Sequence, residues 1–267
     1  MCPIPALNIA GNDYEVAKID LAYAAAEAAG FKLFYSFDMG YSWDAATIAT
    51  IVAKHASSAS TYRWNNQVLV STFAGESYGN AFWASVKTNL AAKGITISLA
   101  PAFTSYRDPA QANTLLSNFP SIDGFFNWWS WYVYFCVYLR LPCAHAALSR
   151  PADTNTLLTT DTDLAYQKAV KTRTGPYIMC AFFSVAFLCH SPCLPRCYSL
   201  IEIAVSPWQF KELGGGNNWV EQSDTLWKYR WEQAINTVKP DIVEIVTWND
   251  YGERSELAHS FLSFHIL

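Results

Sequence analysis

The feature that most constrains the fold of this chain is a regular alternation of strand-like and helix-like runs. Short apolar runs predict strands, and each is followed by a run with apolar residues at helical spacing. Such alternation predicts parallel strands joined by right-handed crossovers, which fits both a barrel and an open doubly wound sheet. The predicted strands are 6–10, 31–37, 67–73, 95–100, 124–129, 176–179 and 241–247, and the predicted helices are 15–30, 43–57, 80–93, one opening at 108–109, 161–172 and 224–238.

Capping residues mark several of these helix ends. Asn12 or Asp13 is expected to cap the first helix, which ends at Gly30, a residue suited to the left-handed C-terminal position. Asp44 and Asp108 are likewise interpreted as N-caps, because short acidic side chains accept hydrogen bonds from the first free N–H groups of a helix. Two further acids, Asp161 and Asp163, are expected only to start a helix.

The size and charge of the chain limit its class. A length of 267 residues with 52% apolar residues predicts one large domain with a substantial core. A net charge of −4 gives the chain no excess of positive charge with which to bind nucleic acid or an anionic membrane surface, so neither partner is expected. We expect a monomer. Many of the 11 Trp residues must lie in the core, since large aromatic side chains bury well, but so many also suit a cleft that stacks sugar rings.

Two segments, 132–150 and 180–204, break the alternation. They hold most of the cysteines and few charges. Each apolar run is shorter than the ~20 residues of a transmembrane helix and is interrupted by Arg or Pro. A metal or disulfide site at Cys189, Cys193 and Cys197, with His190 adjacent, stays a minor alternative, because their spacing matches no CxxC-type zinc pattern and no fourth ligand can be located; the main prediction is no metal. The remaining interpretation is that both segments are foreign to the fold.

Acidic and aromatic residues follow the predicted strands, where a parallel barrel carries its active site. Asp38 and Glu76 end two strand-to-loop junctions, and Trp128 follows a third. An acid in such a place can also serve only to orient its neighbours. The block 248–253 after the last strand is more specific, because no packing rule asks for its combination of acids, amide and aromatics: Trp248, Asn249, Asp250, Tyr251, Gly252 and Glu253. Paired carboxyl groups of this kind suit general acid and base catalysis on an acetal.

These blocks, taken in order, resemble the fungal α-1,3-glucanases (mutanases) of glycoside hydrolase family 71. The similarity is carried by ALNIA, IDLAY, GFKLFYSFDMGYSWD, VLVSTFAGE, DGFFNWWSW, VSPW and VEIVTWNDYGE. It runs from about Ala6 to Glu253, outside segments 132–150 and 180–204. The most specific blocks are SFDM, STFAGE and TWNDYGE.

The resemblance implies a (β/α)8 barrel that hydrolyses α-1,3-glucan with inversion and without a metal or organic cofactor. It places the catalytic acids at Asp250 and Glu253, and we expect Glu253 to be the general acid and Asp250 the base that activates water. Substrate-binding roles are expected for Asp38, Glu76, Trp128, Trp248, Asn249 and Tyr251. The family is secreted, although residues 1–5 have no signal-peptide character.

Departures from the family pattern lead to three further expectations. Removing segments 132–150 and 180–204 restores the pattern, so we hypothesise that both are introns translated in frame; a spliced transcript encoding them would contradict this. The family's first strand–helix unit is missing, which predicts an incomplete barrel, and Trp129 stands where an acid is expected. The alternative function is therefore a glucan-binding relative without turnover, or an inert truncated product.

Overall fold

The computed structural model describes residues 6–128, 159–180, 208–211, 219–222 and 226–244. Most of the described elements form one unit, made by residues 1–128, 161–179 and 240–242. Its strands are β1 (Ala6–Ile9), β2 (Phe34–Asp38), β3 (Arg63–Trp64), β4 (Gln67–Phe73), β5 (Ile97–Leu99), β6 (Phe125–Asn127) and β7 (Tyr177–Cys180), with the start of β10 (Ile242–Glu244). Its helices are α1 (Asp13–Ala29), α2 (Ala45–His55), η1 (Glu76–Tyr78), α3 (Gly79–Ala91), η2 (Pro109–Gln111), α4 (Ala112–Asn118) and α5 (Asp161–Val170).

The main strands lie side by side in the order in which they occur along the chain. β1, β2, β4 and β5 pair in parallel, and β6 pairs in parallel with β7, beside which β10 lies. Backbone N–H groups of Gly124 and Phe126 donate to the carbonyls of Leu99 and Pro101, which joins β5 to β6. Strands in chain order are the arrangement of a (β/α) barrel, whereas a doubly wound sheet reverses its order midway. The doubly wound alternative is therefore wrong.

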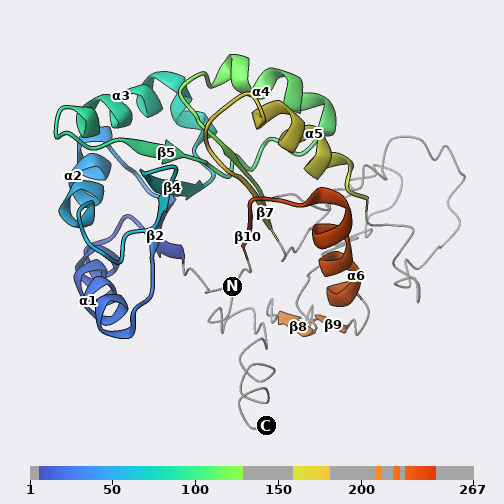
Figure 1. Cartoon of the computed structure of the whole chain (residues 1–267), viewed down its shortest axis with the longest axis horizontal. Coiled ribbons are helices and arrows are strands. Elements are labelled where there is room, and N and C mark those ends of the chain that lie inside the picture. Colours follow the sequence, from blue (N-terminus) through green and yellow to red (C-terminus); the bar gives the residue numbers. More distant parts are fainter. Residues whose placement is uncertain (1–5, 129–158, 181–207, 212–218, 223–225, 245–267) are drawn as a thin grey trace, which may run out of the picture. The chain divides into compact units, whose positions relative to one another are not determined.

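Within this unit, helices α1 to α5 follow one another in an arc on one side of the strands (Figure 1). Alternation along each strand assigns side chains to the helix side or to the opposite, inner side. Tyr35 faces the helices, because its ring lies 5.9 Å from that of Tyr23 on α1. Ser36 and Asp38 therefore face the inner side, as do their register partners Ser71 and Phe73 on β4.

The capping predictions are confirmed. Asn12 Oδ1 accepts a hydrogen bond from Glu15 N at 2.8 Å, and Gly30 ends α1 with a φ of 72°. Asp44 Oδ1 accepts from two backbone N–H groups at the start of α2, and the hydrogen bond from the Thr47 hydroxyl, followed by these backbone bonds, lowers the pKa of Asp44. Asp108 forms a capping box with Gln111.

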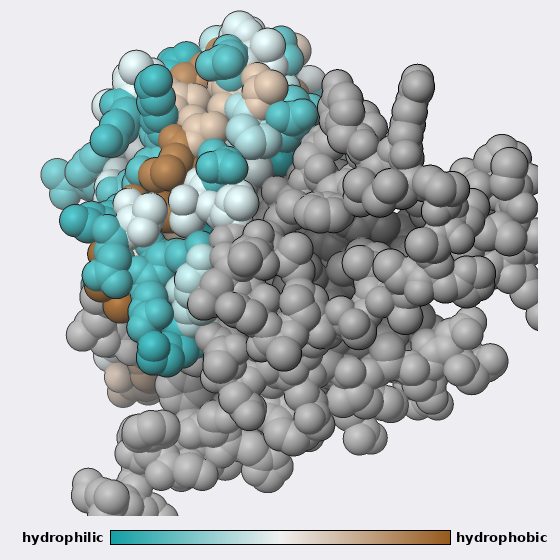
Figure 2. Space-filling view, turned by 90° about the vertical axis from the view of Figure 1, so that its right-hand side faces the viewer, coloured by the Kyte–Doolittle hydropathy of each residue, from teal (hydrophilic) through white to brown (hydrophobic). Residues whose placement is uncertain are grey.

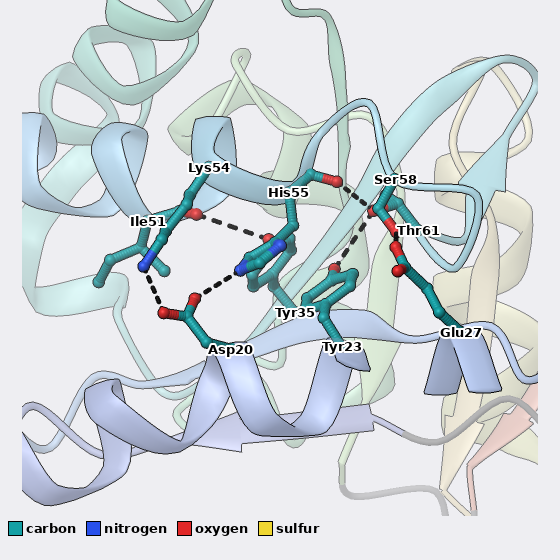
Figure 3. Close-up of polar contacts among 9 residues, drawn as sticks. All are labelled: Asp20, Tyr23, Glu27, Tyr35, Ile51, Lys54, His55, Ser58 and Thr61. Atoms are coloured by element: carbon teal, nitrogen blue, oxygen red, sulfur yellow. Dashed lines mark hydrogen bonds and ion pairs between the residues drawn. The ribbon is translucent and has the colours of Figure 1, made fainter. Parts of the chain in front are cut away.

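The first two helices are joined to each other by a cluster of polar contacts that we call the α1–α2 clasp (Figure 3). Asp20 on α1 binds Lys54 at 2.6 Å and His55 at 2.8 Å, both on α2. The His55 ring stacks on Tyr23 with centroids 4.2 Å apart. The clasp comprises Asp20, Tyr23, Glu27, Tyr35, Ile51, Lys54, His55, Ser58 and Thr61.

A short hairpin is one element that the sequence did not predict. β3 pairs antiparallel with the start of β4 through a turn whose Asn65 and Asn66 have φ values of 47° and 65°. Asn tolerates this left-handed region better than most residues, so an Asn-Asn pair suits the turn. Trp64 Nε1 and Asn65 Nδ2 both donate to the carbonyl of Thr174, at 2.9 and 3.0 Å, which ties the hairpin to the loop after α5.

The second unit contains the remaining described elements. β8 (Trp208–Lys211) and β9 (Trp219–Gln222) form an antiparallel pair that was also not predicted. The helix predicted over 224–238 is α6 (Leu226–Gln233), which continues as the π-helix η4 (Ala234–Val238).

On the face shown in Figure 2, hydrophilic residues cover most of the described surface, with hydrophobic residues scattered among them.

Candidate active site

The carboxyl ends of the parallel strands bring two predicted site residues, Asp38 and Trp128, to one edge of the sheet. Asp38, the last residue of β2, is in register with Phe73, the last residue of β4. The Phe73 ring packs edge-on against Trp128, which follows β6, with centroids 4.8 Å apart. Asp38 and Trp128, which lie ninety residues apart in sequence, therefore flank the same phenylalanine on the inner side. We call this edge, with the loops that follow the strands, the carboxyl rim.

Asp38 is half-buried and sits in a tight turn. Its Oδ1 accepts a hydrogen bond from Gly40 N at 2.9 Å. Its backbone carbonyl accepts from Trp43 Nε1 at 2.9 Å and from Tyr41 N at 3.3 Å. These bonds fix the backbone at Asp38. Of its two carboxylate oxygens, only Oδ1 accepts a hydrogen bond from the described part of the chain. Such an arrangement leaves the side chain able to accept a further hydrogen bond from a ligand.

The turn after β4 explains the STFAGE sequence. Ser71 and Thr72 are buried, and their hydroxyl groups donate to the carbonyls of Ala100 and Ala74, each at 2.8 Å. Ala74 has a φ of 58°, a left-handed conformation that costs a non-Gly residue of order 1–3 kcal/mol. The backbone is therefore strained at Ala74, directly after the end of β4.

Gly75 continues this strained turn. It has a φ of 113°, and a Cβ at this position would lie 2.7 Å from Trp83 Cζ2 and 2.9 Å from Met39 Cγ. The Gly75 carbonyl accepts a hydrogen bond from Trp83 Nε1 at 3.2 Å. Only glycine fits both the backbone angle and the space against the buried indole. Glu76 follows this turn as the first residue of η1.

Glu76 connects the loops after β4 and β5. Its Oε1 accepts a hydrogen bond from Ser105 N at 2.6 Å. Its Oε2 is buried, and the described residues offer it no hydrogen-bond partner. A buried carboxylate oxygen normally has a partner, so this atom marks a place where a donor from water or a ligand is expected.

The loops that follow successive strands are tied to one another. Tyr78 in η1 accepts a hydrogen bond from Trp43 N at 3.1 Å and donates one to the carbonyl of Tyr41 at 2.9 Å, which joins the loops after β2 and β4. Gly11 in the loop after β1 approaches Tyr41 so closely that a Cβ on the glycine would lie 2.7 Å from Tyr41 Cβ. The rim is thus a linked framework rather than a set of independent loops.

A buried polar cluster contains Asn127, the residue before Trp128. Asn127 points toward the helices, where its Nδ2 donates to Asp163 Oδ1 at 3.1 Å. Tyr177 also donates to Asp163 Oδ1, at 2.8 Å, and Asp163 is fully buried. Asp161 and Asp163 do start α5, as predicted, but the burial of Asp163 was missed. Sequence alone gave no signal for it, because its partners come from two distant strands.

The predicted residues of block 248–253 lie outside the described residues: Trp248, Asn249, Asp250, Tyr251 and Glu253. The described acid just before them is Glu244 on β10. Burial raises the pKa of Glu244 to about 8, and its Oε2 has no hydrogen-bond partner in the described ranges. A glutamate inside the apolar run DIVEIVT was the signal that could have singled it out.

Other kinds of site receive no support from the described part of the chain. Within it, no group of three or more His, Cys, Asp and Glu side chains is arranged to hold a metal ion. No described helix has the length and apolar character to cross a membrane. A shallow pocket lies at the amino end of β2, away from the rim, and is lined by Glu27, Gly30, Phe31, Lys32, Ala59 and Ser60.

Comparison with known proteins identifies the family. The family model of Glycosyl hydrolase family 71 matches residues 5–260, nearly the whole chain. The chain belongs to glycosyl hydrolase family 71. The resemblance inferred from the sequence blocks is therefore confirmed, and the matched range includes both the rim residues and block 248–253.

Curated relatives of this family 71 chain are fungal proteins. It is 31% identical to the glucan endo-1,3-alpha-glucosidase agn1 of Schizosaccharomyces pombe, over 93% of this chain and 49% of that protein. It is 30% identical to the mutanase Pc12g07500 of Penicillium rubens, over 93% of this chain and 44% of that protein. It is 28% identical to the ascus wall endo-1,3-alpha-glucanase of S. pombe. The chain spans about half the length of these relatives.

Solved structures share the fold of this family 71 chain at low sequence identity. The GH99 endo-alpha-mannosidase from Bacteroides thetaiotaomicron superposes with a TM-score of 0.59 and 12% identity, covering 94% of this chain and 67% of that one. A second structure of that enzyme gives a TM-score of 0.56, also at 12% identity. Similarity at this level supports the fold and carries no information on substrate.

Proposed function

We propose that this chain hydrolyses α-1,3-glucosidic linkages in a cell-wall α-glucan or mutan. The observation that carries the proposal is the family 71 match over residues 5–260, with relatives named as endo-1,3-alpha-glucanases and a mutanase. The rim adds chemical support, because half-buried Asp38 lies in register with Phe73, whose ring packs against the indole of Trp128, and half-buried Glu76 follows the same strand as Phe73. Carboxylates that accept hydroxyl hydrogen bonds, next to an aromatic face, suit a sugar chain.

We further infer an inverting mechanism in which Glu253 and Asp250 act as a pair. Glu253 protonates the glycosidic oxygen as the bond to the anomeric carbon breaks, and Asp250 removes a proton from the water that attacks the opposite face. The proton given by Glu253 leaves on the released sugar hydroxyl, and the proton taken by Asp250 restores the pair after exchange with solvent. Trp248, Asn249 and Tyr251 would hold the sugar beside them, together with Asp38, Glu76 and Trp128.

The proposal extends to the architecture and the setting of the enzyme. A pair of this kind must face one groove, which the chain-order strands would provide if they belong to a (β/α)8 barrel. The glucan substrate implies action outside the cell or in its wall, as the name of the ascus wall relative indicates for that protein. Segments 132–150 and 180–204 lie almost entirely outside the described residues, and their foreign origin stays a prediction.

Incubation of the full chain with insoluble α-1,3-glucan tests the proposal. We expect release of sugars whose new reducing ends are first β anomers, seen by NMR before mutarotation. Asp250→Asn and Glu253→Gln should each lower kcat by about a hundredfold or more, since general acid and base catalysis contributes about that much. The matched control is Glu232→Gln, an exposed acid on α6, which should retain full activity.

Each part of the proposal has its own contrary outcome. Release of α anomers would contradict inversion, and full activity of either variant would contradict the assigned pair. Binding of glucan without any hydrolysis by the parent chain would identify a glucan-binding relative instead. Neither binding nor hydrolysis would point to an inert product.

A further inference from the structure

Tyr41 is an exposed aromatic residue in the tight turn that begins at Asp38. Tyr41 is 43% exposed, although it lies only three positions after Asp38, the last residue of the buried strand β2. Among the described residues, the Tyr41 ring has no aromatic partner and its hydroxyl makes no hydrogen bond. The ring of Tyr41 is therefore available to a ligand on the carboxyl rim.

The backbone that carries this exposed ring is fixed from three sides. Tyr41 N donates to the Asp38 carbonyl at 3.3 Å, and the Tyr41 carbonyl accepts from Tyr78 Oη at 2.9 Å. Close approach of Gly11 confines the Tyr41 Cβ, because a methyl group on that glycine would lie only 2.7 Å away. Because these contacts hold the backbone in place, mainly the side-chain torsions of Tyr41 have freedom to lose on binding, which favours affinity.

A second exposed tyrosine shows what an ordinary surface ring looks like in this protein. Tyr14 on α1 is 69% exposed, and the ammonium group of Lys18 lies 4.9 Å from its ring centroid. Single exposed aromatics of this kind are normal on protein surfaces and need no function. Tyr41 differs because it shares a four-residue turn with a predicted substrate-binding acid.

We propose that Tyr41 forms an additional sugar-binding subsite, in which its ring stacks on a pyranose face of the α-1,3-glucan chain beyond the glucose held near Asp38. The inference rests on the proposed function and deepens it, since it assigns an aromatic platform to the loop after β2. The ring acts on binding of the chain and takes no part in proton transfer. Long chains that reach the subsite therefore depend on Tyr41 more than short oligosaccharides do.

The test compares Tyr41→Ala, Tyr41→Leu and Tyr41→Phe with the parent chain and with the control Tyr14→Ala. Binding is measured by depletion onto insoluble α-1,3-glucan, and kcat/KM is measured on the polymer and on a short α-1,3-linked oligosaccharide. Loss of one stacking contact should weaken polymer binding about threefold to tenfold in Tyr41→Ala and Tyr41→Leu. Tyr41→Phe keeps the ring and should bind within about twofold of the parent, as should Tyr14→Ala.

The outcomes separate this inference from the proposed function. If the parent cleaves the glucan and Tyr41→Leu binds the polymer as the parent does, the subsite is wrong and the proposed function stands. A loss in Tyr41→Phe equal to that in Tyr41→Ala would also overturn stacking, because it would assign the effect to the hydroxyl. If the parent neither binds nor cleaves the glucan, the proposed function and the subsite fall together. Thermal unfolding of each variant shows whether a loss comes from folding.

Discussion

The α1–α2 clasp and the carboxyl rim are both rich in polar and aromatic side chains, yet they differ in whether the polar groups have hydrogen-bond partners. In the clasp, both carboxylate oxygens of Asp20 are occupied, one by Lys54 and one by His55. The Glu27 carboxylate accepts a hydrogen bond from Ser58 Oγ at 2.6 Å, and Tyr35 donates to the Ile51 carbonyl. Each group that approaches the helix interface has a partner from another element (Figure 3).

At the rim, in contrast, groups are held in place but left incomplete. Glu76 Oε2 is buried with no partner recorded in the described part of the chain, and Ala74 and Gly75 adopt left-handed backbone angles. Tyr41 has a fixed backbone and an exposed ring. Natural proteins retain strain and unsatisfied polar groups mainly where function needs them. We therefore expect the clasp to contribute stability, and we propose that the rim binds the ligand.

The turn after β4 should be the part of the rim most sensitive to substitution. Gly75→Ala places a methyl group against the Trp83 indole at a φ of 113°, so we expect a loss of about 2–5 kcal/mol in the free energy of unfolding. Gly94→Ala is the control, because Gly94 has a φ of 72° but nothing within 4 Å of the added Cβ, and about 1–2 kcal/mol should be lost. Urea titration measures both. Equal losses would show that contact with Trp83 does not matter.

An acid of the rim and an acid of the clasp should separate activity from stability. Glu76→Gln keeps an oxygen that can accept from Ser105 N, so the free energy of unfolding should change by about 1 kcal/mol or less. Its glucan hydrolysis should fall about tenfold to a hundredfold, since a charge-assisted hydrogen bond to the substrate is weakened. The matched variant Glu27→Gln in the clasp should leave hydrolysis unchanged. Equal activity of the two variants would remove Glu76 from the site.

The smallest effect is expected for the ion pairs of the clasp. Hydrogen bonds from Lys54 and then His55 lower the pKa of Asp20 below its usual value of 3.8. Because the folded-state pKa is the lower one, the stabilisation is present above pH 3.8 and is lost as the pH falls through the folded-state value. Asp20→Asn should therefore melt slightly below the parent at neutral pH, and the difference should shrink in acid. Thermal melts at several pH values test this, and a constant difference would contradict it.

The sequence predicted most elements of the fold because local signals and tertiary packing agree there. The predicted strand 67–73 is β4 itself, and Ile48, Ile51 and Val52 are buried on α2 as their spacing indicated. The misses have physical causes. β3 is two residues long and is defined by its partner on β4, and β8 and β9 are four residues each and are likewise defined by their pairing with each other.

The candidate site was predicted residue by residue, but its connections were not. Asp38 ends a strand, and Glu76 and Trp128 come after strands, which a one-dimensional pattern can show. That Phe73 joins Asp38 to Trp128, or that Glu76 reaches Ser105, depends on strand register and loop packing. The partners of Asp163 likewise come from β6 and β7, and no spacing along the chain indicates them.

The amino-acid sequence by itself determined the alternation of strands and helices, the capped helix ends and the family blocks, because these depend on neighbours within a few residues. The tertiary structure decided the order of the strands in the sheet and which polar groups find partners. It also decided which side chains stay open at the rim. The reason is that hydrogen bonds between elements join residues far apart in the chain, and only the folded backbone brings their donors and acceptors within reach.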